Sequence, residues 1–237
     1  MEIKLDDMVE GARRAEGTAV IVDIFRATSL MATLFGMGAK EIYPTTELDE
    51  ARKRRDELGE RLGQKVYMVG ECKGVTTDDF DIANTPITAF RKYSQGELKG
   101  KTIVGSSTNG YKGLLESEKA DEIITSSFLN ADATLAYLKE KQPDLVTIIG
   151  MGEFGEPSDE DTMFCEFLKA RLEDRRYDDQ ELREYLRDCK TAKIMRDHFG
   201  GWVQEDINFC LDPERSYDVV PLLEGGRIID ASNHRRR

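Results

Sequence analysis

Short runs of β-branched and other apolar residues alternate with helical patterns along most of this chain. Such runs occupy residues 19–22, 42–43, 66–69, 102–104, 123–124 and 145–149. Strands that alternate with helices are typical of a parallel sheet that is covered by helices. The sequence therefore predicts an α/β fold with a mostly parallel sheet or sheets and flanking helices.

Several helix boundaries are visible between these runs. Helices are predicted at residues 47–62, 86–93, 110–117 and 131–141. The first ends at Gly63 and the second opens at Pro86, which fits the preference for glycine after a helix and proline in its first turn. After Gly150 the pattern changes to helices over residues 162–198, then a closing helix and a short final strand. We therefore expect a largely helical C-terminal part.

The whole chain, residues 1–237, is expected to form one compact enzyme unit. The regions around Asp23 and around Glu160 and Asp161 share one order: apolar strand, loop with carboxylates, helix. This order predicts two related halves, about 1–125 and 126–230, that face a shared polar cleft. Residues 231–237 are predicted to be a flexible tail.

Charge and cysteine content narrow the function. The formal net charge is -12 with acidic residues spread along the chain, so a nucleic-acid backbone would be repelled. The four cysteines lie far apart, which argues against a zinc or iron–sulfur site and predicts reduced thiols in a cytoplasmic protein. No run approaches the ~20 apolar residues of a membrane-spanning helix, so no membrane partner is expected.

Ligands of parallel sheets bind beyond the carboxyl ends of the strands, and four loops there carry polar side chains. These loops supply Asp23, Arg26, Thr28 and Ser29; Glu71 and Lys73; Ser106, Ser107, Thr108, Asn109 and Gly110; and Glu153, Asp159, Glu160 and Asp161. Carboxylates from three loops beside phosphate donors indicate an oxygen-only Mg²⁺ site. Surface carboxylates and turn or cap residues would explain the same pattern without a site.

Three common phosphate fingerprints are missing. The segment after the first apolar run has Asp23 but Phe25, so it lacks the paired aspartates of haloacid-dehalogenase-type phosphatases. Neither a Walker A loop nor a glycine-rich dinucleotide motif is present. Nucleoside triphosphates and dinucleotides are therefore not predicted as ligands.

An ordered set of segments resembles the 2-phosphosulfolactate phosphatase family between about residues 19 and 210. The segments are residues 22–29 (VDIFRATS), 70–71 (GE), 80–86 (FDIANTP), 108–110 (TNG), 127–131 (SFLNA) and 160–161 (ED). The resemblance implies an α/β fold with two related halves around a large polar cleft. It also implies Mg²⁺-dependent hydrolysis of (R)-2-phospho-3-sulfolactate to 3-sulfolactate and phosphate, a step of coenzyme M biosynthesis in methanogens.

Two departures from the family pattern bear on the substrate. Cys72 stands where relatives typically carry arginine, and Ala83 stands where glycine is usual. If an arginine at the first position holds the sulfonate, Lys73 can replace part of its charge but not its bidentate geometry. The exact substrate, sulfolactate phosphate or another phosphorylated 2-hydroxy acid, therefore stays open.

The candidate roles follow from the loops and the resemblance. Asp23, Glu71 and one or both of Glu160 and Asp161 are expected to hold Mg²⁺. Asp23, Arg26 and Asn109 are the expected catalytic residues, and Asp23 would orient water or act as nucleophile. The expected substrate-binding residues are Thr28, Ser29, Lys73, Asn84, Thr108 and Gly110.

Two other functions remain open from the sequence. One is a metal-dependent hydrolase or lyase that acts on a different acidic metabolite. The other is a non-catalytic module that senses an anion. The sequence does not fix the oligomeric state, although a homodimer is common for enzymes of this size.

Overall fold

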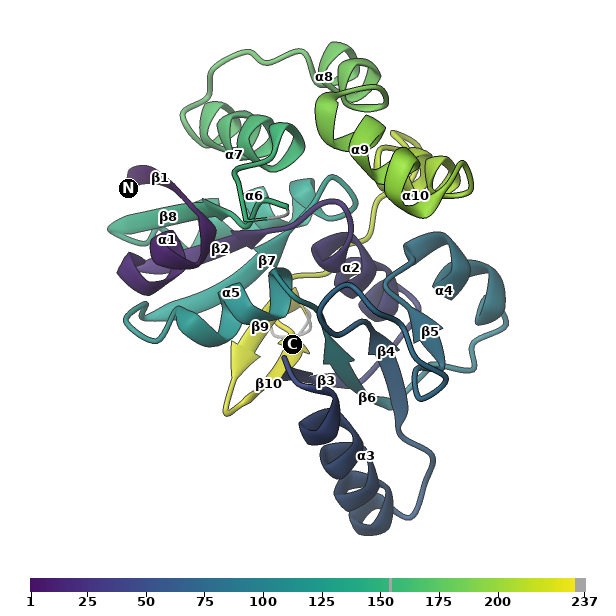
Figure 1. Ribbon diagram of the computed structural model, residues 1–237. Helices are drawn as coiled ribbons and strands as arrows, with labels where there is room; N and C mark the ends of the chain where they lie inside the picture. Colours follow the sequence, from purple (N-terminus) through teal and green to yellow (C-terminus); the bar gives the residue numbers. More distant parts are fainter. Residues whose placement is uncertain (154, 233–237) are drawn as a thin grey trace.

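One sheet of ten strands organises the part of the chain that the computed structural model describes, residues 1–153 and 155–232. The strand order is β1-β8-β2-β7-β9-β10-β3-β6-β4-β5 (Figure 1). The strands are β1 (Glu2–Asp7), β2 (Thr18–Val22), β3 (Glu41–Thr45), β4 (Tyr67–Gly70), β5 (Ile82–Ala83), β6 (Thr102–Ser106), β7 (Glu122–Ser126), β8 (Leu145–Gly150), β9 (Pro221–Glu224) and β10 (Arg227–Asp230).

Helices connect most of these strands. They are α1 (Met8–Arg14), α2 (Ala27–Gly36), α3 (Leu48–Leu62), α4 (Pro86–Lys92), α5 (Gly110–Glu116), α6 (Ala131–Lys141), α7 (Asp159–Leu172), α8 (Asp179–Leu186), α9 (Lys190–Phe199) and α10 (Val203–Cys210). The α/β class, the mostly parallel sheet and the flanking helices are confirmed. As expected, α3 ends at Gly63, whose φ of 61° is left-handed, and α4 opens with Pro86.

The sheet consists of two parallel groups and an antiparallel joint. In the first group β1, β8, β2 and β7 run parallel, and in the second β3, β6, β4 and β5 do so. The hairpin β9–β10 joins them, with Leu222 opposite Ile124 of β7 and Ile228 opposite Ile42 of β3. The first group draws strands from both sides of residue 125, so a boundary there does not separate the two groups.

Strand β2 shows why the sheet is covered on both faces. All five of its residues are buried, because alternate side chains point to opposite faces and both faces carry helices. Val20 and Val22 pack in the cluster that includes Phe164 of α7. Ile21 packs on the other face with Leu114 of α5.

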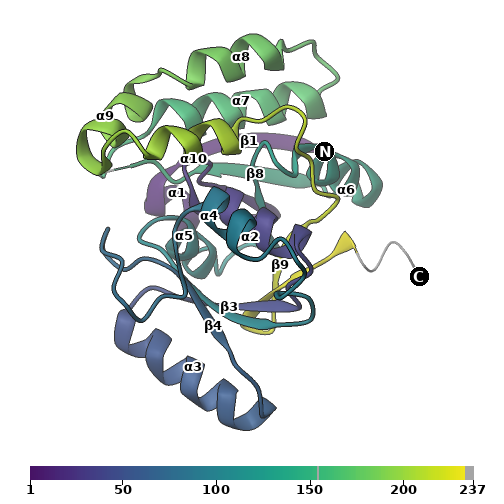
Figure 2. The same cartoon turned by 90° about the vertical axis from the view of Figure 1, so that its right-hand side faces the viewer.

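The helical C-terminal part is also confirmed. Helices α7, α8, α9 and α10 gather along one side of the sheet in both views, with α3 at the opposite end (Figures 1 and 2). Within the described ranges, none of the helices has both the length and the apolar character needed to cross a membrane.

The chain remains ordered slightly beyond the expected start of the tail. Ala231 donates its backbone N–H to Val220 over 2.9 Å, and the Ser232 hydroxyl donates to Asp230 over 2.8 Å. Both residues are buried. A flexible tail from residue 231 is therefore wrong for these two residues, and the rest of that expectation lies outside the described part of the chain.

Candidate active site

A cavity of about 860 Å³ opens at the carboxyl ends of strands from both parallel groups. Residues that follow β2, β4, β6 and β8 line it, so the structure brings the four predicted loops together. Seven of the site residues expected from the sequence line the cavity: Asp23, Arg26, Glu71, Lys73, Asn84, Thr108 and Asn109. This position matches the rule that ligands of parallel sheets bind beyond the carboxyl ends of strands.

Asp23 lines the cavity directly after β2 and is almost fully buried. One carboxylate oxygen accepts a hydrogen bond from the Ala27 N–H over 3.1 Å. The other faces the first residue of α5, where a Cβ on Gly110 would lie 2.9 Å from it. Burial, followed by the charge of Glu71, raises the pKa of Asp23 to about 6, although the amides of Ala27 and Gly110 oppose the shift.

Thr28 and Ser29 do not line the cavity, which corrects their expected role in substrate binding. Both side chains are completely buried. The Thr28 hydroxyl donates to the Asp23 carbonyl over 2.9 Å, and the Ser29 hydroxyl donates to the Ile24 carbonyl over 2.9 Å. These hydroxyls satisfy backbone groups of the turn between β2 and α2, so they shape the loop that carries Asp23.

Glu71 holds the loop after β6 in place. One of its carboxylate oxygens accepts the Thr108 N–H over 2.6 Å, and the other accepts the Thr108 hydroxyl over 2.9 Å and the Gly74 N–H over 2.5 Å. Lys73 lies nearby, but its ammonium is exposed and bonds Glu47 over 3.0 Å. Glu71 therefore connects the loops after β4 and β6 at the cavity wall.

Cys72 does not line the cavity. Its sulfur lies 3.1 Å from the Ser106 hydroxyl, and the side chain packs against the apolar cluster beside α3. Lys73, Gly74 and Val75 form the adjoining wall instead. Any effect of Cys72 on substrate choice must therefore act through the position of the turn that follows it.

Asn109 connects the loop after β6 to the loop after β8. Its amide nitrogen donates to the Gly152 carbonyl over 3.1 Å and to the Glu153 carboxylate over 3.2 Å. Glu153 lines the cavity, and burial together with the charge of Asp23 raises its pKa to about 8. Glu153 is therefore the carboxylate that the fourth loop directs to the cavity.

Glu160 and Asp161 lie behind this wall and do not line the cavity. Asp161 accepts the Ile24 N–H over 2.9 Å with one oxygen and the Gly152 N–H over 3.0 Å with the other. Burial and the charge of Glu160 raise the pKa of Asp161 well above its ordinary value, and burial raises that of Glu160 to about 7. The structure thus gives Asp161 a backbone-bracing position instead of the expected place on the cavity wall.

The expected Mg²⁺ can be compared with these donors. Within residues 1–153 and 155–232, no three Asp, Glu, His or Cys side chains are grouped so that they could hold a metal ion together. Asp23, Glu71 and Glu153 nevertheless line one cavity, where the charge of Glu71 contributes to the raised pKa of Asp23 and the charge of Asp23 to the raised pKa of Glu153. Because Mg²⁺ commonly uses one or two carboxylates and completes its shell with water and phosphate oxygens, this oxygen donor set fits the ion.

Arg26 lines the same cavity as these carboxylates and is held by residues that the sequence did not point to. Its guanidinium donates to Asp206 of α10 over 2.9 Å. The same guanidinium lies 5.2 Å from the ring centre of Phe199 and 5.6 Å from that of Trp202. Asp206 is 180 residues away in sequence and resembles an ordinary acidic residue in the first turn of a helix, so no local pattern pointed to it.

The corner between α9 and α10 forms the apolar side of the cavity. Met195, His198, Phe199 and Trp202 line it there. His198, in the last turn of α9, is thus part of the cavity wall. The corner between α9 and α10 thus gives an apolar and aromatic wall to a site that the sequence predicted as polar.

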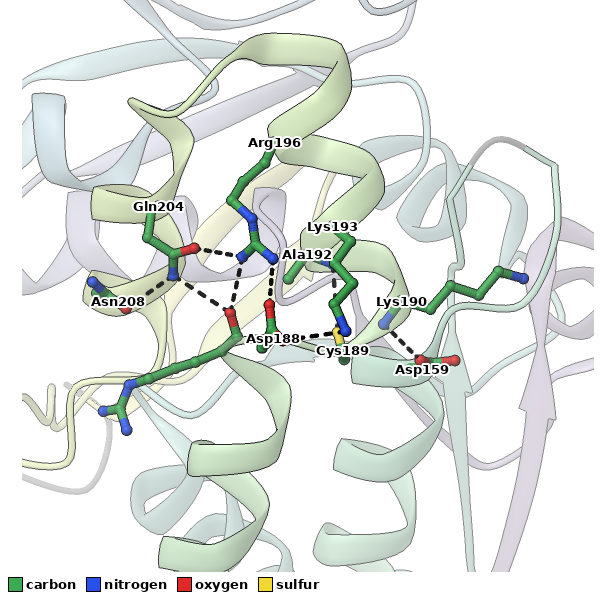
Figure 3. A network of polar contacts seen from close by, with 10 residues as sticks. Asp159, Asp188, Cys189, Lys190, Ala192, Lys193, Arg196, Gln204 and Asn208 are labelled. Carbon is green, nitrogen blue, oxygen red and sulfur yellow. Dashed lines mark hydrogen bonds and ion pairs between the residues drawn. The ribbon is translucent and has the colours of Figure 1, made fainter.

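A polar network fixes this corner to the neighbouring helices (Figure 3). The Arg196 guanidinium donates to the Gln204 side chain over 2.5 Å and to the Arg187 carbonyl over 3.2 Å, and it also bonds Asp188. Gln204 extends the network to Asn208 over 3.1 Å. The start of α10, which leads to Asp206, is therefore tied to the end of α8 and to α9.

Asn84 and Thr85 present polar atoms with unmet hydrogen-bonding capacity. Both residues line the cavity just before α4. The Asn84 amide oxygen and the Thr85 hydroxyl are buried and have no hydrogen-bond partner among the described residues. Buried polar atoms normally have a hydrogen-bond partner, so these two atoms are exceptions at the edge of the cavity.

The fold and the cavity define an α/β protein whose polar site lies at the carboxyl ends of parallel strands. Comparison with known families specifies it further, because the model of the family described as 2-phosphosulpholactate phosphatase matches residues 4–226. The chain belongs to this family of phosphoric monoester hydrolases, which confirms the resemblance seen in the sequence.

Individual relatives agree with this assignment. A protein of Carboxydothermus hydrogenoformans is 34% identical over 241 residues, covering 94% of both chains. A protein of Clostridium perfringens is 31% identical and covers 89% of this chain and 87% of its own length. One of Thermoplasma acidophilum is 31% identical, covering 90% and 88% respectively. Each is named a probable 2-phosphosulfolactate phosphatase.

Proposed function

We propose that this protein is a Mg²⁺-dependent phosphatase that hydrolyses 2-phosphosulfolactate, or a close phosphorylated 2-hydroxy acid, to the hydroxy acid and phosphate. The observation that carries the proposal is the cavity, where Asp23, Glu71 and Glu153 line the wall near Arg26. Carboxylates suit a cation and a guanidinium suits a phosphate, so the two kinds of group serve one phosphate ester.

In this proposal Asp23 and Glu71 would hold Mg²⁺, with Glu153 beside them. When bound, the ion would neutralise charge on the phosphate oxygens. Arg26 directs donors to the same phosphate, and Asn84 and Thr85 orient the hydroxy-acid portion. Asp23, the buried carboxylate of the cavity, either directs water that attacks phosphorus as the bond to the ester oxygen breaks, or attacks phosphorus itself with departure of the hydroxy acid and later hydrolysis of the acyl phosphate by water.

The proposed setting is the cytoplasm. All four cysteines are free thiols, and three of them are buried, which suits a reducing compartment. A homodimer is the proposed assembly. If 3-sulfolactate is the product, the enzyme would serve coenzyme M biosynthesis.

Phosphate release from purified protein tests the proposal. With Mg²⁺ present we expect turnover of 2-phosphosulfolactate or of another member of a panel of phosphorylated 2-hydroxy acids, and EDTA should stop it. Asp23→Asn should nearly abolish turnover. The matched control Asp49→Asn changes a carboxylate that is 95% exposed on α3 and should leave turnover unchanged.

Two outcomes would contradict the proposal. Full turnover by Asp23→Asn would remove Asp23 from the catalytic site. Stabilisation of the protein by the esters without phosphate release at any Mg²⁺ concentration would instead indicate an anion-binding module.

A further inference from the structure

The buried ion pair between Arg26 and Asp206 assigns a further residue to the site. Resting on the proposed phosphatase function, we propose that Asp206 is the positioning residue of Arg26 and fixes its guanidinium so that the remaining donors meet the phosphate. Asp206 touches neither substrate nor metal in this proposal. It acts through Arg26.

Burial makes this ion pair different from the many surface pairs of the chain. The two atoms are 2.9 Å apart, and the side chains are only 9% exposed for Arg26 and 0% for Asp206. Screening by water is weak at such a site, and loss of either partner leaves the other charge buried and unpaired. The position of the guanidinium therefore depends strongly on this one carboxylate.

The two oxygens of Asp206 serve different elements. One accepts from Arg26, and the other accepts the Ile87 N–H over 3.1 Å at the start of α4. Because the carboxylate is shared in this way, it engages Arg26 through a single nitrogen, Nη1. The bond to Asp206 uses Nη1, so we assign Nε and Nη2 as the donors to an anion in the cavity that Arg26 lines.

The contact with Ile87 also connects Arg26 to the start of α4 at the cavity. Ile87 follows Asn84 and Thr85 by only a few residues, and both of these residues line the cavity and carry an unsatisfied polar atom. Asp206 thus fixes the separation between the guanidinium and this polar edge. A substrate that contacts both would find them already arranged.

Two aromatic rings restrict Arg26 further. Phe199 and Trp202 lie within 6 Å of the guanidinium carbon, and Trp202 remains 52% exposed at the cavity edge. Aromatic rings packed over the face of a guanidinium do not block its N–H donors, because these donors point outward in the plane of the group. With Asp206 on one side, the accessible donors are confined to the direction of the cavity.

Double-mutant kinetics test the proposal. We expect Arg26→Ala to lower kcat/KM at least ~100-fold and Asp206→Asn at least ~10-fold. In the double variant the loss should equal that of Arg26→Ala alone, because Asp206 has nothing left to position. Glu205→Gln is the matched control, since Glu205 precedes Asp206 on α10 but is 60% exposed and pairs with Arg91; it should match the wild type.

Chemical rescue separates positioning from a general effect on folding. Guanidinium chloride at ~10 mM, well below denaturing concentrations, should restore part of the activity of Arg26→Ala but none to the double variant, because the carboxylate holds the added cation. Asp206→Glu provides a second variant if Asp206→Asn does not fold. It keeps the buried charge but displaces it, and should retain the fold and lose activity.

The outcomes distinguish this proposal from the phosphatase assignment. Wild-type kcat/KM in Asp206→Asn, independent losses in the double variant, or equal rescue of both Arg26→Ala backgrounds would overturn the positioning role. If the wild type releases no phosphate, the phosphatase assignment fails. The affinity for inorganic phosphate in the presence of Mg²⁺ is then measured for the wild type, the two single variants and the double variant. Weakened phosphate binding by Asp206→Asn would support positioning, and unchanged binding would overturn it.

Discussion

Gly110, the first residue of α5, has no room for a side chain. A Cβ added there would lie 2.7 Å from the Ala27 Cβ and 2.9 Å from a carboxylate oxygen of Asp23. Ordinary contacts between carbon atoms are ~3.5–4.0 Å, so Gly110→Ala must displace one of these neighbours by roughly 1 Å. We expect this variant to lose stability and, more strongly, activity.

The magnitude follows from two opposing terms. Overpacking a filled site costs about 1–3 kcal/mol, whereas replacing glycine by alanine in a helix gains at most about 1 kcal/mol. A net loss of about 1–2 kcal/mol is expected. Since a ~1 Å misplacement of a catalytic group can cost about 100-fold in rate, the displaced Asp23 should lower kcat by a comparable factor.

Gly59 in α3 provides the matched control. The nearest atom to a Cβ there is 3.7 Å away, so Gly59→Ala should gain roughly 0.5–1 kcal/mol without any change in kcat. Urea midpoints at constant m value and phosphate release measure the two quantities. If Gly110→Ala behaves like Gly59→Ala, the close approach to Asp23 is refuted; lost stability with full kcat would refute the link to catalysis.

Three further changes are predicted. Hydrogen bonds from Arg52 and Thr77 lower the pKa of Asp79 to about 2, so Asp79→Asn should destabilise the protein at pH 6, with a deficit that fades as the pH falls from 3.8 toward 2 in urea titrations. Arg196→Ala should cost about 2 kcal/mol by urea midpoint and lower phosphate affinity in calorimetry. Phe164→Ala should cost about 3–5 kcal/mol in urea, since its ring is fully buried.

Each of these predictions has a clear contrary result. A pH-independent deficit would show that Asp79 does not gain stability from its ionised form. Lys193→Ala is the control for Arg196, since Lys193 pairs with the same Asp188 from an exposed position; equal losses would refute the role of the internal network. A loss below about 1 kcal/mol for Phe164→Ala would contradict its place in the core.

Elements with a strong local signal could be predicted from the sequence. Gly63 and Pro86 marked helix ends because their backbone preferences are intrinsic, and the apolar run of β2 marked a strand buried on both faces. Strand β1 escaped detection because most of its residues are exposed at the sheet edge, so it carries no apolar run. Its pairing with β8 is defined only by the tertiary fold.

The site divides in the same way. The carboxyl-end rule identified the four loops, because parallel strands place their ends at one edge. The rule did not identify which side chains of these loops point into the cavity. Thr28, Ser29 and Asp161 were therefore expected to contact a ligand, whereas in the structure they form hydrogen bonds with the backbone. Asp206 could not be found because its partner, Arg26, lies near the other end of the sequence.

The hairpin β9–β10 completes the sheet late in synthesis. Every other strand of the described sheet is synthesised earlier, yet the strand pairing that joins the two parallel groups runs through residues 221–230. Domains form progressively during translation, and long-range strand pairing is slow. On the ribosome, the inner strands β7 and β3 therefore gain their pairing partners only after this last hairpin has emerged.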